Sequence, residues 1–184
     1  MRIRHHASLG LAATACLVLS GCTNAADWNA NRSSQIHSFD TSSIQAQPDI
    51  IAKLPQGALE DGVLDVAAST DYAPAEFLDP SGTAVGYDVD LTNAIAAVLG
   101  VKGKVHTAEF DSIIASIGSK YDAGISSFTV TPERTAEVDM TAYINVGSRF
   151  NVQAGNPKDV ETSDHLKLCG RTIGVQVGTA QETT

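Results

Sequence analysis

Apolar residues at helical spacing, set between short apolar strands, constrain this chain more than any other feature. Two runs repeat at the i, i+3, i+4 and i+7 positions that place side chains on one face of a helix. They are Leu91, Ala94, Ile95 and Val98, followed by Phe110, Ile113, Ile114 and Ile117. Strand candidates at residues 63–68, 104–107 and 121–125 precede, separate and follow these runs. Strands that alternate with amphipathic helices predict an α/β fold built from βαβ units around a parallel sheet.

The residues between the first strand and the first helix predict a loop and a turn. Residues 69–77 show no regular period, and Asp-Pro-Ser-Gly at residues 79–82 is a turn signal between two short extended pieces. Asp88 is expected to cap the helix at its N-terminus, and Gly100 is expected to end it. The Asp90 carboxylate is expected to interact favourably with the positive end of the helix dipole.

The pattern changes beyond residue 143. We expect a short strand at 139–141, an exposed alternating strand at 148–153, another strand at 172–177 and the start of a helix at Gly178. This last part is too short to bury a core of its own.

The first 21 residues predict an export signal. Arg2 and Arg4 precede a short apolar run from Ala7 to Leu19. The run closes with Leu-Ser-Gly-Cys at residues 19–22, which resembles the lipobox of bacterial lipoproteins and implies that Cys22 carries a lipid. An ordinary signal peptide with a coincidental cysteine is the alternative. Residues 22–58, rich in Asn, Ser, Gln and Ala, predict a flexible tether from membrane to domain.

The net charge of the chain and the spacing of its possible metal ligands argue against several functions. The net charge of −9 argues against nucleic acid as a partner, because nothing offsets phosphate repulsion. No apolar run is long enough to span a bilayer. His37, His106 and His165 are too scattered for a metal site, and we expect no cofactor. Cys169 is the one cysteine left after the signal and the lipid site, so a partner cysteine is expected beyond residue 184.

The strand-to-helix loop at residues 126–134, Ser-Ser-Phe-Thr-Val-Thr-Pro-Glu-Arg, is the strongest candidate for a binding site. Thr131 suits an N-cap and Pro132 the first helical position, so hydroxyl and backbone N–H groups there favour an anion. Arg134 falls in the first turn, where the helix dipole disfavours a cation. It is therefore predicted to grip a carboxylate with its planar fork. A capped surface helix with a solvated arginine is the alternative.

Three further motifs stand in register with this loop. They are Tyr-Ala-Pro at 72–74 with Phe77, Gly-Tyr-Asp-Val-Asp-Leu at 86–91, and Gly-Val-Gln-Val-Gly-Thr at 174–179. Together the four resemble family 3 of the bacterial solute-binding proteins, receptors of polar amino-acid ABC transporters, over about residues 62–182. Ala75 departs from the pattern where an aromatic is common. Ala180 departs where a second threonine is common, which puts one hydroxyl contact in doubt.

The resemblance implies roles for particular residues. Ser127, Thr129 and Arg134 would hold the α-carboxylate of an amino acid, with Ser126 in the same row. Tyr72 and Phe110 would wall the side-chain pocket, and ordinary core packing is the alternative for both. Thr179 would donate from the second lobe, or merely cap a helix. Asp88 and Asp90 are expected to be structural.

The resemblance also implies a periplasmic-binding-protein type II-like organisation. Residues 59–148 would form the first lobe, 149–157 a crossover, and 158–184 the start of a truncated second lobe. In this family the ligand is held between two lobes, so a chain with a truncated second lobe should bind its ligand weakly or not at all.

The implied function is a substrate-binding lipoprotein of an amino-acid ABC importer on the extracytoplasmic face of the cell membrane. It would hand its ligand to a permease and perform no chemistry. One alternative is a cyclohexadienyl dehydratase-like enzyme, for which Glu76, expected on a solvated loop, is the only nearby general acid. The other is a sensor or adaptor module.

Overall fold

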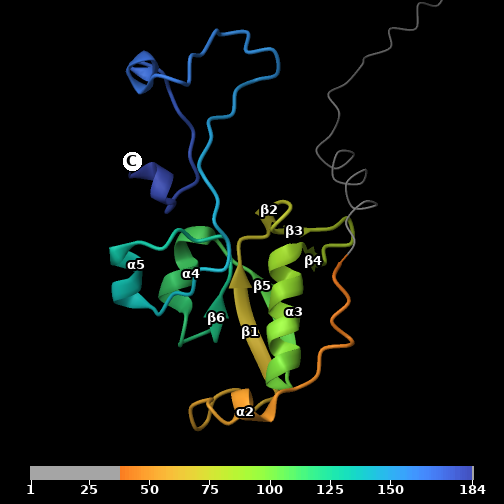
Figure 1. Cartoon of the computed structure of the whole chain (residues 1–184). Helices are drawn as coiled ribbons and strands as arrows, with labels where there is room; N and C mark the ends of the chain where they lie inside the picture. Colours follow the sequence, from red (N-terminus) through yellow and green to blue (C-terminus); the bar gives the residue numbers. More distant parts are fainter. Residues whose placement is uncertain (1–37, 184) are drawn as a thin grey trace, which may run out of the picture.

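A three-stranded parallel sheet in the order β5-β1-β6 forms the centre of the structure, a computed structural model that describes residues 38–183. β1 (Val63–Ala68) pairs with β5 (Lys102–Thr107) along its whole length, from Val63 opposite Lys102 to Ala68 opposite Thr107. It pairs on its other side with β6 (Ala123–Gly124). The predicted α/β fold with a parallel sheet is therefore confirmed (Figure 1).

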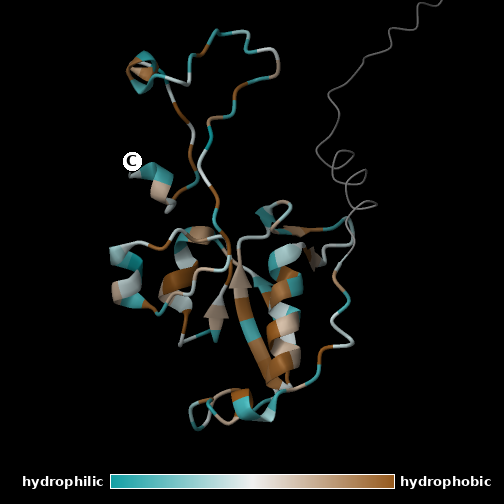
Figure 2. Ribbon diagram, in the orientation of Figure 1, coloured by the Kyte–Doolittle hydropathy of each residue, from teal (hydrophilic) through white to brown (hydrophobic). Residues whose placement is uncertain are grey.

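Helices cover the two faces of β1, because successive side chains of a strand point to opposite sides. Leu64 and Val66 form a buried cluster with Ala96 of α3 (Tyr87–Leu99). Ala67 packs instead with Ile113 of α4 (Phe110–Ser116). Figure 2 shows β1 as apolar along most of its length. Burial on both faces explains why its sequence is a nearly continuous apolar run.

The buried face of α3 is not the predicted one. Val89, Thr92 and Ala96 are buried, whereas Ile95 is 43% exposed. The helix lies close to β5, since a Cβ atom on Gly103 would come within 3.3 Å of the Ala96 Cβ. Small side chains are required at such a contact, so the row that contains Ile95 faces away. Apolar spacing alone could not show which row meets the sheet.

A glycine, and not Asp88, caps α3. Gly86 is the N-cap with φ at 125°, and a Cβ there would lie 2.2 Å from the Ala75 carbonyl oxygen. That carbonyl accepts the Asp88 N–H at 2.9 Å. The backbone conformation and the close approach each require glycine. Asp88 is left one residue inside the helix, with its side chain in the core.

The segment predicted as a loop contains a small antiparallel sheet in the order β2-β3-β4. Its strands are β2 (Asp71–Tyr72), β3 (Glu76–Leu78) and β4 (Ala84–Val85). The predicted turn is confirmed between β3 and β4, where Gly82 N–H donates to the Asp79 carbonyl at 2.9 Å.

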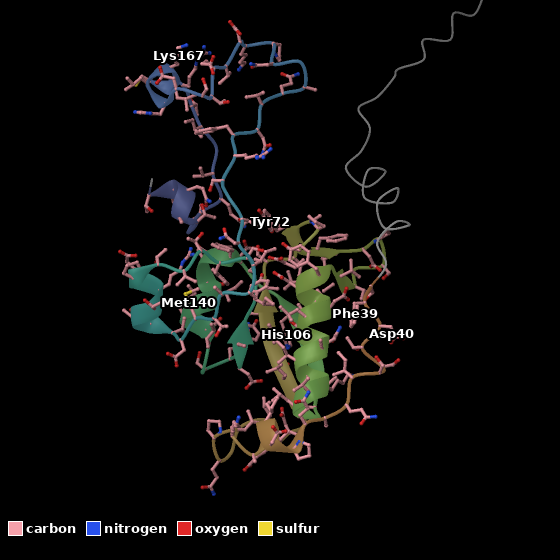
Figure 3. The ribbon with its side chains drawn as sticks, in the orientation of Figure 1. Phe39, Asp40, Tyr72, His106, Met140 and Lys167 are labelled. Carbon is pink, nitrogen blue, oxygen red and sulfur yellow. The ribbon has the colours of Figure 1, made fainter. Side chains whose placement is uncertain are left out.

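The described part of the expected tether contacts the domain. Phe39 N–H donates to the Asp90 carboxylate at 2.8 Å, and the Ser38 hydroxyl donates to the same group. Further on, Gln47 N–H donates to the Val98 carbonyl at 2.9 Å, just before the short helix α2 (Pro48–Ile51). Figure 3 shows Phe39 beside α3. Asp90 therefore holds this segment as well as standing in the first turn of α3.

After α5 (Pro132–Glu137) the chain leaves the α/β body and then returns beside α4 and α5 (Figure 1). The strands expected at 139–141, 148–153 and 172–177 are absent from the described structure. Strand backbone groups need a neighbouring strand to pair with, and none of the strands within residues 38–183 pairs with these segments. The helix expected at Gly178 is the short 3₁₀ helix η2 (Ala180–Glu182), and η1 (His165–Leu168) was not predicted.

Within residues 38–183, no helix combines the length and hydrophobicity needed to cross a bilayer. The predicted signal peptide and Cys22 lie outside the described residues. Cys169 is an exposed free thiol.

We predict that Gly86→Ala lowers the free energy of unfolding by about 3 kcal/mol, since the methyl group adds a clash to backbone strain. Gly82→Ala is the matched control, because φ there is also positive at 81° but a Cβ would meet nothing within 4 Å. We expect it to cost about 1 kcal/mol. Urea unfolding measures both, and equal losses would contradict the close approach at Gly86.

Candidate functional site

Polar residues follow each strand of the parallel sheet at one edge. Ser69 and Thr70 follow β1, Glu109 stands two residues past β5, and Ser126 stands two residues past β6. In open α/β sheets, ligands bind outside this carboxyl edge. The candidate site is therefore the set of loops at this edge, together with the segment that returns to it.

Arg134 lies in the first turn of α5, as predicted. Thr131 is the N-cap, and its Oγ1 accepts the Arg134 N–H at 3.3 Å. Pro132 occupies the first helical position, where its missing N–H costs nothing. The predicted strand-to-helix loop with its cap is confirmed.

The Arg134 guanidinium lies over two aromatic rings. Its central carbon lies 5.7 Å from the centre of the Phe110 ring and 5.3 Å from that of Phe128. These two rings stack on each other with their centres 4.5 Å apart. Burial lowers the pKa of Arg134 below its ordinary value. The side chain is partly desolvated and lies within cation–π distance of both rings, while its hydrogen bonds stay exposed to solvent.

Two backbone carbonyls hold the guanidinium in place. Nη1 donates to the Thr129 carbonyl at 2.7 Å, and Nη2 donates to the Gly178 carbonyl at 2.8 Å. Gly178 belongs to the returning segment and rests on α4, where a Cβ would lie 2.8 Å from the Asp111 Cβ. Arg134 thus joins the loop of its own helix to a segment more than forty residues away.

The serine and threonine residues of the loop differ in whether their hydroxyl groups are exposed and already hydrogen-bonded within the protein. The buried Ser126 Oγ donates to Glu76 Oε1 at 2.5 Å and accepts the Ser69 N–H at 3.0 Å, so it is committed to the protein. No hydrogen bond of normal geometry reaches the buried Ser127 Oγ within residues 38–183, but the Tyr143 hydroxyl lies beside it, and Ser127 adopts a positive φ of 49°. The Thr129 side chain is exposed. Thr129 is therefore open to a ligand in this conformation, whereas the Ser127 hydroxyl is buried.

The other predicted site residues differ in their distance from Arg134, their exposure and their hydrogen bonding. Phe110 lies directly beneath Arg134, as described above. Tyr72 is 54% exposed in β2 (Figure 3). Thr179 stands next to Gly178, but its hydroxyl donates to the Gln176 carbonyl at 2.7 Å and its N–H to the same carbonyl at 3.3 Å. Its donors are thus occupied in this conformation.

Glu76 is not on a solvated loop, so that prediction was wrong. It lies in β3 with none of its surface exposed, beside the equally buried Asp88. Burial, and secondarily the neighbouring Asp88 and Asp71 carboxylates, raise the pKa of Glu76 to about 8, although the Ser126 hydrogen bond opposes this shift. The Tyr143 hydroxyl donates to the Asp88 carboxylate at 2.8 Å. Burial raises the pKa of Tyr143 as well.

A hollow of about 220 Å³ opens at the same edge of the sheet. Its polar lining includes two acids, Asp71 and Glu109. The Ser69 hydroxyl donates to Asp71 at 2.9 Å and accepts from Gln176 Nε2 at 3.4 Å. The remaining lining residues are Thr70, Leu78, Thr107 and Ala108. Gln176 thus contacts Ser69 in the lining of the hollow, and Gly178, two residues further on, contacts Arg134.

Several residues of the site were missed from the sequence. Ser69 and Glu109 could have been found, because each is among the first polar residues after a predicted strand. Phe128 was visible as an aromatic inside the hydroxyl-rich loop. Tyr143 carries no local signal, since its partner Asp88 lies 55 residues away in the chain.

Comparison with known protein families matches residues 64–177 to the bacterial extracellular solute-binding proteins, family 3. This match covers more than half of the chain. The chain belongs to that family. Its α/β body with a parallel sheet agrees with this membership.

The similar curated proteins of family 3 are amino-acid-binding proteins. The arginine-binding protein ArgT of Corynebacterium glutamicum is 31% identical over 96% of this chain and 56% of its own length. The L-cystine-binding protein TcyJ of Escherichia coli is 33% identical, over 67% of this chain and 46% of its own. The arginine-binding extracellular protein ArtP of Bacillus subtilis is 34% identical, over 65% and 46%. The chain therefore spans about half the length of the curated relatives it matches.

Solved structures of similar sequence include an ancestral arginine-binding protein bound to arginine. It is 42% identical, with a TM-score of 0.41, over 42% of this chain and 35% of that one. The ancestral amino-acid-binding protein AncCDT-1, a precursor of cyclohexadienyl dehydratase, is 38% identical with a TM-score of 0.41 over the same shares.

We predict that Ser126→Ala destabilises the fold by about 1–3 kcal/mol, because the Ser69 N–H and the Glu76 carboxyl each lose a buried partner. Ser127→Ala is the matched control and should change stability little, since no hydrogen bond of normal geometry reaches the Ser127 Oγ. Chemical unfolding of both variants decides between them. Equal destabilisation would show that the Ser126 hydroxyl is not the structural one.

Proposed function

We propose that this chain binds a free amino acid through its α-carboxylate as the substrate-binding component of an ABC importer. Ser127, Thr129 and Arg134 would contact the carboxylate, and Phe110 would support the arginine from beneath. The bound amino acid would pass to a permease. Cys22 would anchor the protein to the extracytoplasmic face of the cell membrane. Membership of family 3 and the amino-acid-binding relatives support this proposal.

The observation that carries the proposal is a guanidinium held over two aromatic rings with some of its N–H donors unused. Arginine has five N–H donors, and the structure occupies two of the Arg134 nitrogens with carbonyls of Thr129 and Gly178. Carbonyls fix the direction of the guanidinium but leave its charge unbalanced. Both ion pairs among residues 38–183 involve Asp65, not Arg134. A partly desolvated cation without a counter-ion is suited to a ligand carboxylate.

The acids of the neighbouring hollow favour a ligand with a cationic side chain. Asp71 and Glu109 line a space large enough for a lysine or arginine stem. Gln176 and Gly178 bring this space close to Arg134, so one amino acid could reach both with opposite ends. The arginine-binding names of several relatives agree with this charge arrangement.

The geometry favours binding over chemistry. A general acid must touch its substrate, and Glu76, the candidate for a dehydratase, has no exposed surface. Incubation with prephenate or arogenate is therefore expected to yield no aromatic product. Product formation that disappears in Glu76→Gln would support the enzyme instead.

We predict that Arg134→Lys weakens L-arginine binding about tenfold or more, because lysine cannot present the planar two-point fork. Isothermal titration calorimetry measures this change, with thermal unfolding as a check on the fold. The exposed Arg149→Lys is the matched control and should bind as the parent chain does. An unchanged affinity in Arg134→Lys would reject the carboxylate role.

We predict that Asp71→Asn combined with Glu109→Gln reduces the preference for L-arginine over L-glutamine, since both acids of the hollow become neutral. The measured quantity is the ratio of the two dissociation constants. Asp159→Asn, a change of the same kind on the outlying segment, should leave the ratio unchanged. If the double variant keeps the parent ratio, the hollow does not hold the ligand side chain.

A further inference from the structure

Two fully buried carboxyl groups lie side by side between the small sheet and α3. Glu76 comes from β3 and Asp88 from the first turn of α3, and both have no exposed surface. The binding site proposed above does not use either of them. Buried acids normally lie next to a cation, but neither ion pair within residues 38–183 includes Glu76 or Asp88.

One carboxyl oxygen of the Glu76–Asp88 pair has no hydrogen-bond donor among the described residues. Glu76 Oε1 accepts from the Ser126 hydroxyl at 2.5 Å. The Tyr143 hydroxyl lies 2.8 Å from each oxygen of Asp88. Glu76 Oε2 is buried without a donor among the described residues. An ionised Glu76 would leave this oxygen unpaired, whereas a protonated one could donate from Oε2 to the Asp88 carboxylate.

The groups that face the pair come from every element around it, and none is a cation. β2 contributes Asp71, the loop after β6 contributes Ser126, and the departing segment contributes Tyr143. Two negative charges at such a site would repel each other without compensation. Burial and the two aspartates together raise the pKa of Glu76 to about 8, in agreement with the geometry.

We propose that Glu76 and Asp88 hold one proton between them, and that this protonated pair fixes the ligand-binding loop through Ser126 and the departing segment through Tyr143. Ser126 directly precedes Ser127, the residue with the buried hydroxyl in the proposed site. Tyr143 lies after α5, at the start of the segment that carries η1 and η2. Loss of the proton to solvent would place two charges in the core and loosen both attachments. The consequence for ligand binding rests on the proposed function, whereas the shared proton does not.

The expected effect of pH on stability has a definite direction. The folded chain keeps the Glu76 proton up to about pH 8, whereas the unfolded chain loses it near the ordinary value of 4.5. Between these values the folded state binds more protons than the unfolded state. The contribution of Glu76 to stability therefore falls as pH rises through this window and levels off above it.

Glu76→Gln tests the proposal, because its amide is permanently neutral, can donate to Asp88 and can still accept from Ser126. The unfolding free energy of the parent chain minus that of Glu76→Gln should fall steadily from about pH 4.5 to about 8. The exposed Glu137→Gln on α5 is the matched control, and its difference from the parent should stay nearly flat. A flat difference for Glu76→Gln would overturn the proposal.

Infrared spectroscopy supplies a second measurement, and its decisive result comes from the parent chain itself. A protonated carboxyl band should persist at neutral pH and disappear with a midpoint near 8. It should be absent from Glu76→Gln and present in Glu137→Gln. Absence of the band from the parent chain at neutral pH would overturn the proposal.

Calorimetry with L-arginine over the same pH range separates this proposal from the proposed function. If the shared proton also holds the site, affinity should fall as pH rises toward 8 in the parent chain, and Glu76→Gln should remove that trend. Failure of L-arginine to bind at any pH, with the infrared band present, would reject the proposed ligand but leave the shared proton standing. Binding with the same pH trend in both proteins would reject the link between the proton and the loop.

Discussion

Coverage of β1 on both faces is the constraint on which the rest of this structure depends. Its alternate side chains meet Ala96 of α3 on one face and Ile113 of α4 on the other. A strand buried in this way must end in loops that emerge at the sheet edge, because its flanks are closed by helices. Ser69 and Thr70 therefore stand at the same edge as Glu109 and Ser126. The candidate site follows from this arrangement of the sheet.

Within that edge, Arg134 connects parts of the chain that are distant in sequence. One carbonyl acceptor lies on its own loop and the other on the returning segment. Such contacts set the direction of a guanidinium while leaving it electrostatically unsatisfied. The same segment touches the acidic hollow through Gln176. Under the proposed function this segment would join carboxylate recognition to side-chain recognition.

Local sequence signals predicted much of this structure. Thr131, Pro132 and Arg134 were placed correctly because a cap, a first-turn proline and a first-turn arginine depend on neighbours within one helical turn. Likewise, β1 and α4 were recognisable from their own apolar patterns. The resemblance to family 3 then supplied a reason to regard Arg134 as a binding residue.

Contacts between distant residues could not be predicted in the same way. The buried row of α3 was misassigned because the decisive contact, Ala96 against Gly103, involves two elements. Glu76 was expected in solvent because no local sequence pattern indicates that Ser126 and Asp88 pack against it. The strands expected at 148–153 and 172–177 have suitable alternation, but no described strand pairs with them to complete their hydrogen bonds.

The proposed function depends on recognition of an amino-acid carboxylate by Arg134. The most direct measurement compares L-arginine with agmatine, which keeps the guanidinium side chain but lacks the carboxylate, by isothermal titration calorimetry on the same preparation. We expect L-arginine to bind measurably more tightly than agmatine, and this difference to shrink in Arg134→Lys, where the charge remains but the planar fork is lost. Equal affinity of the parent chain for both compounds would contradict this role of Arg134.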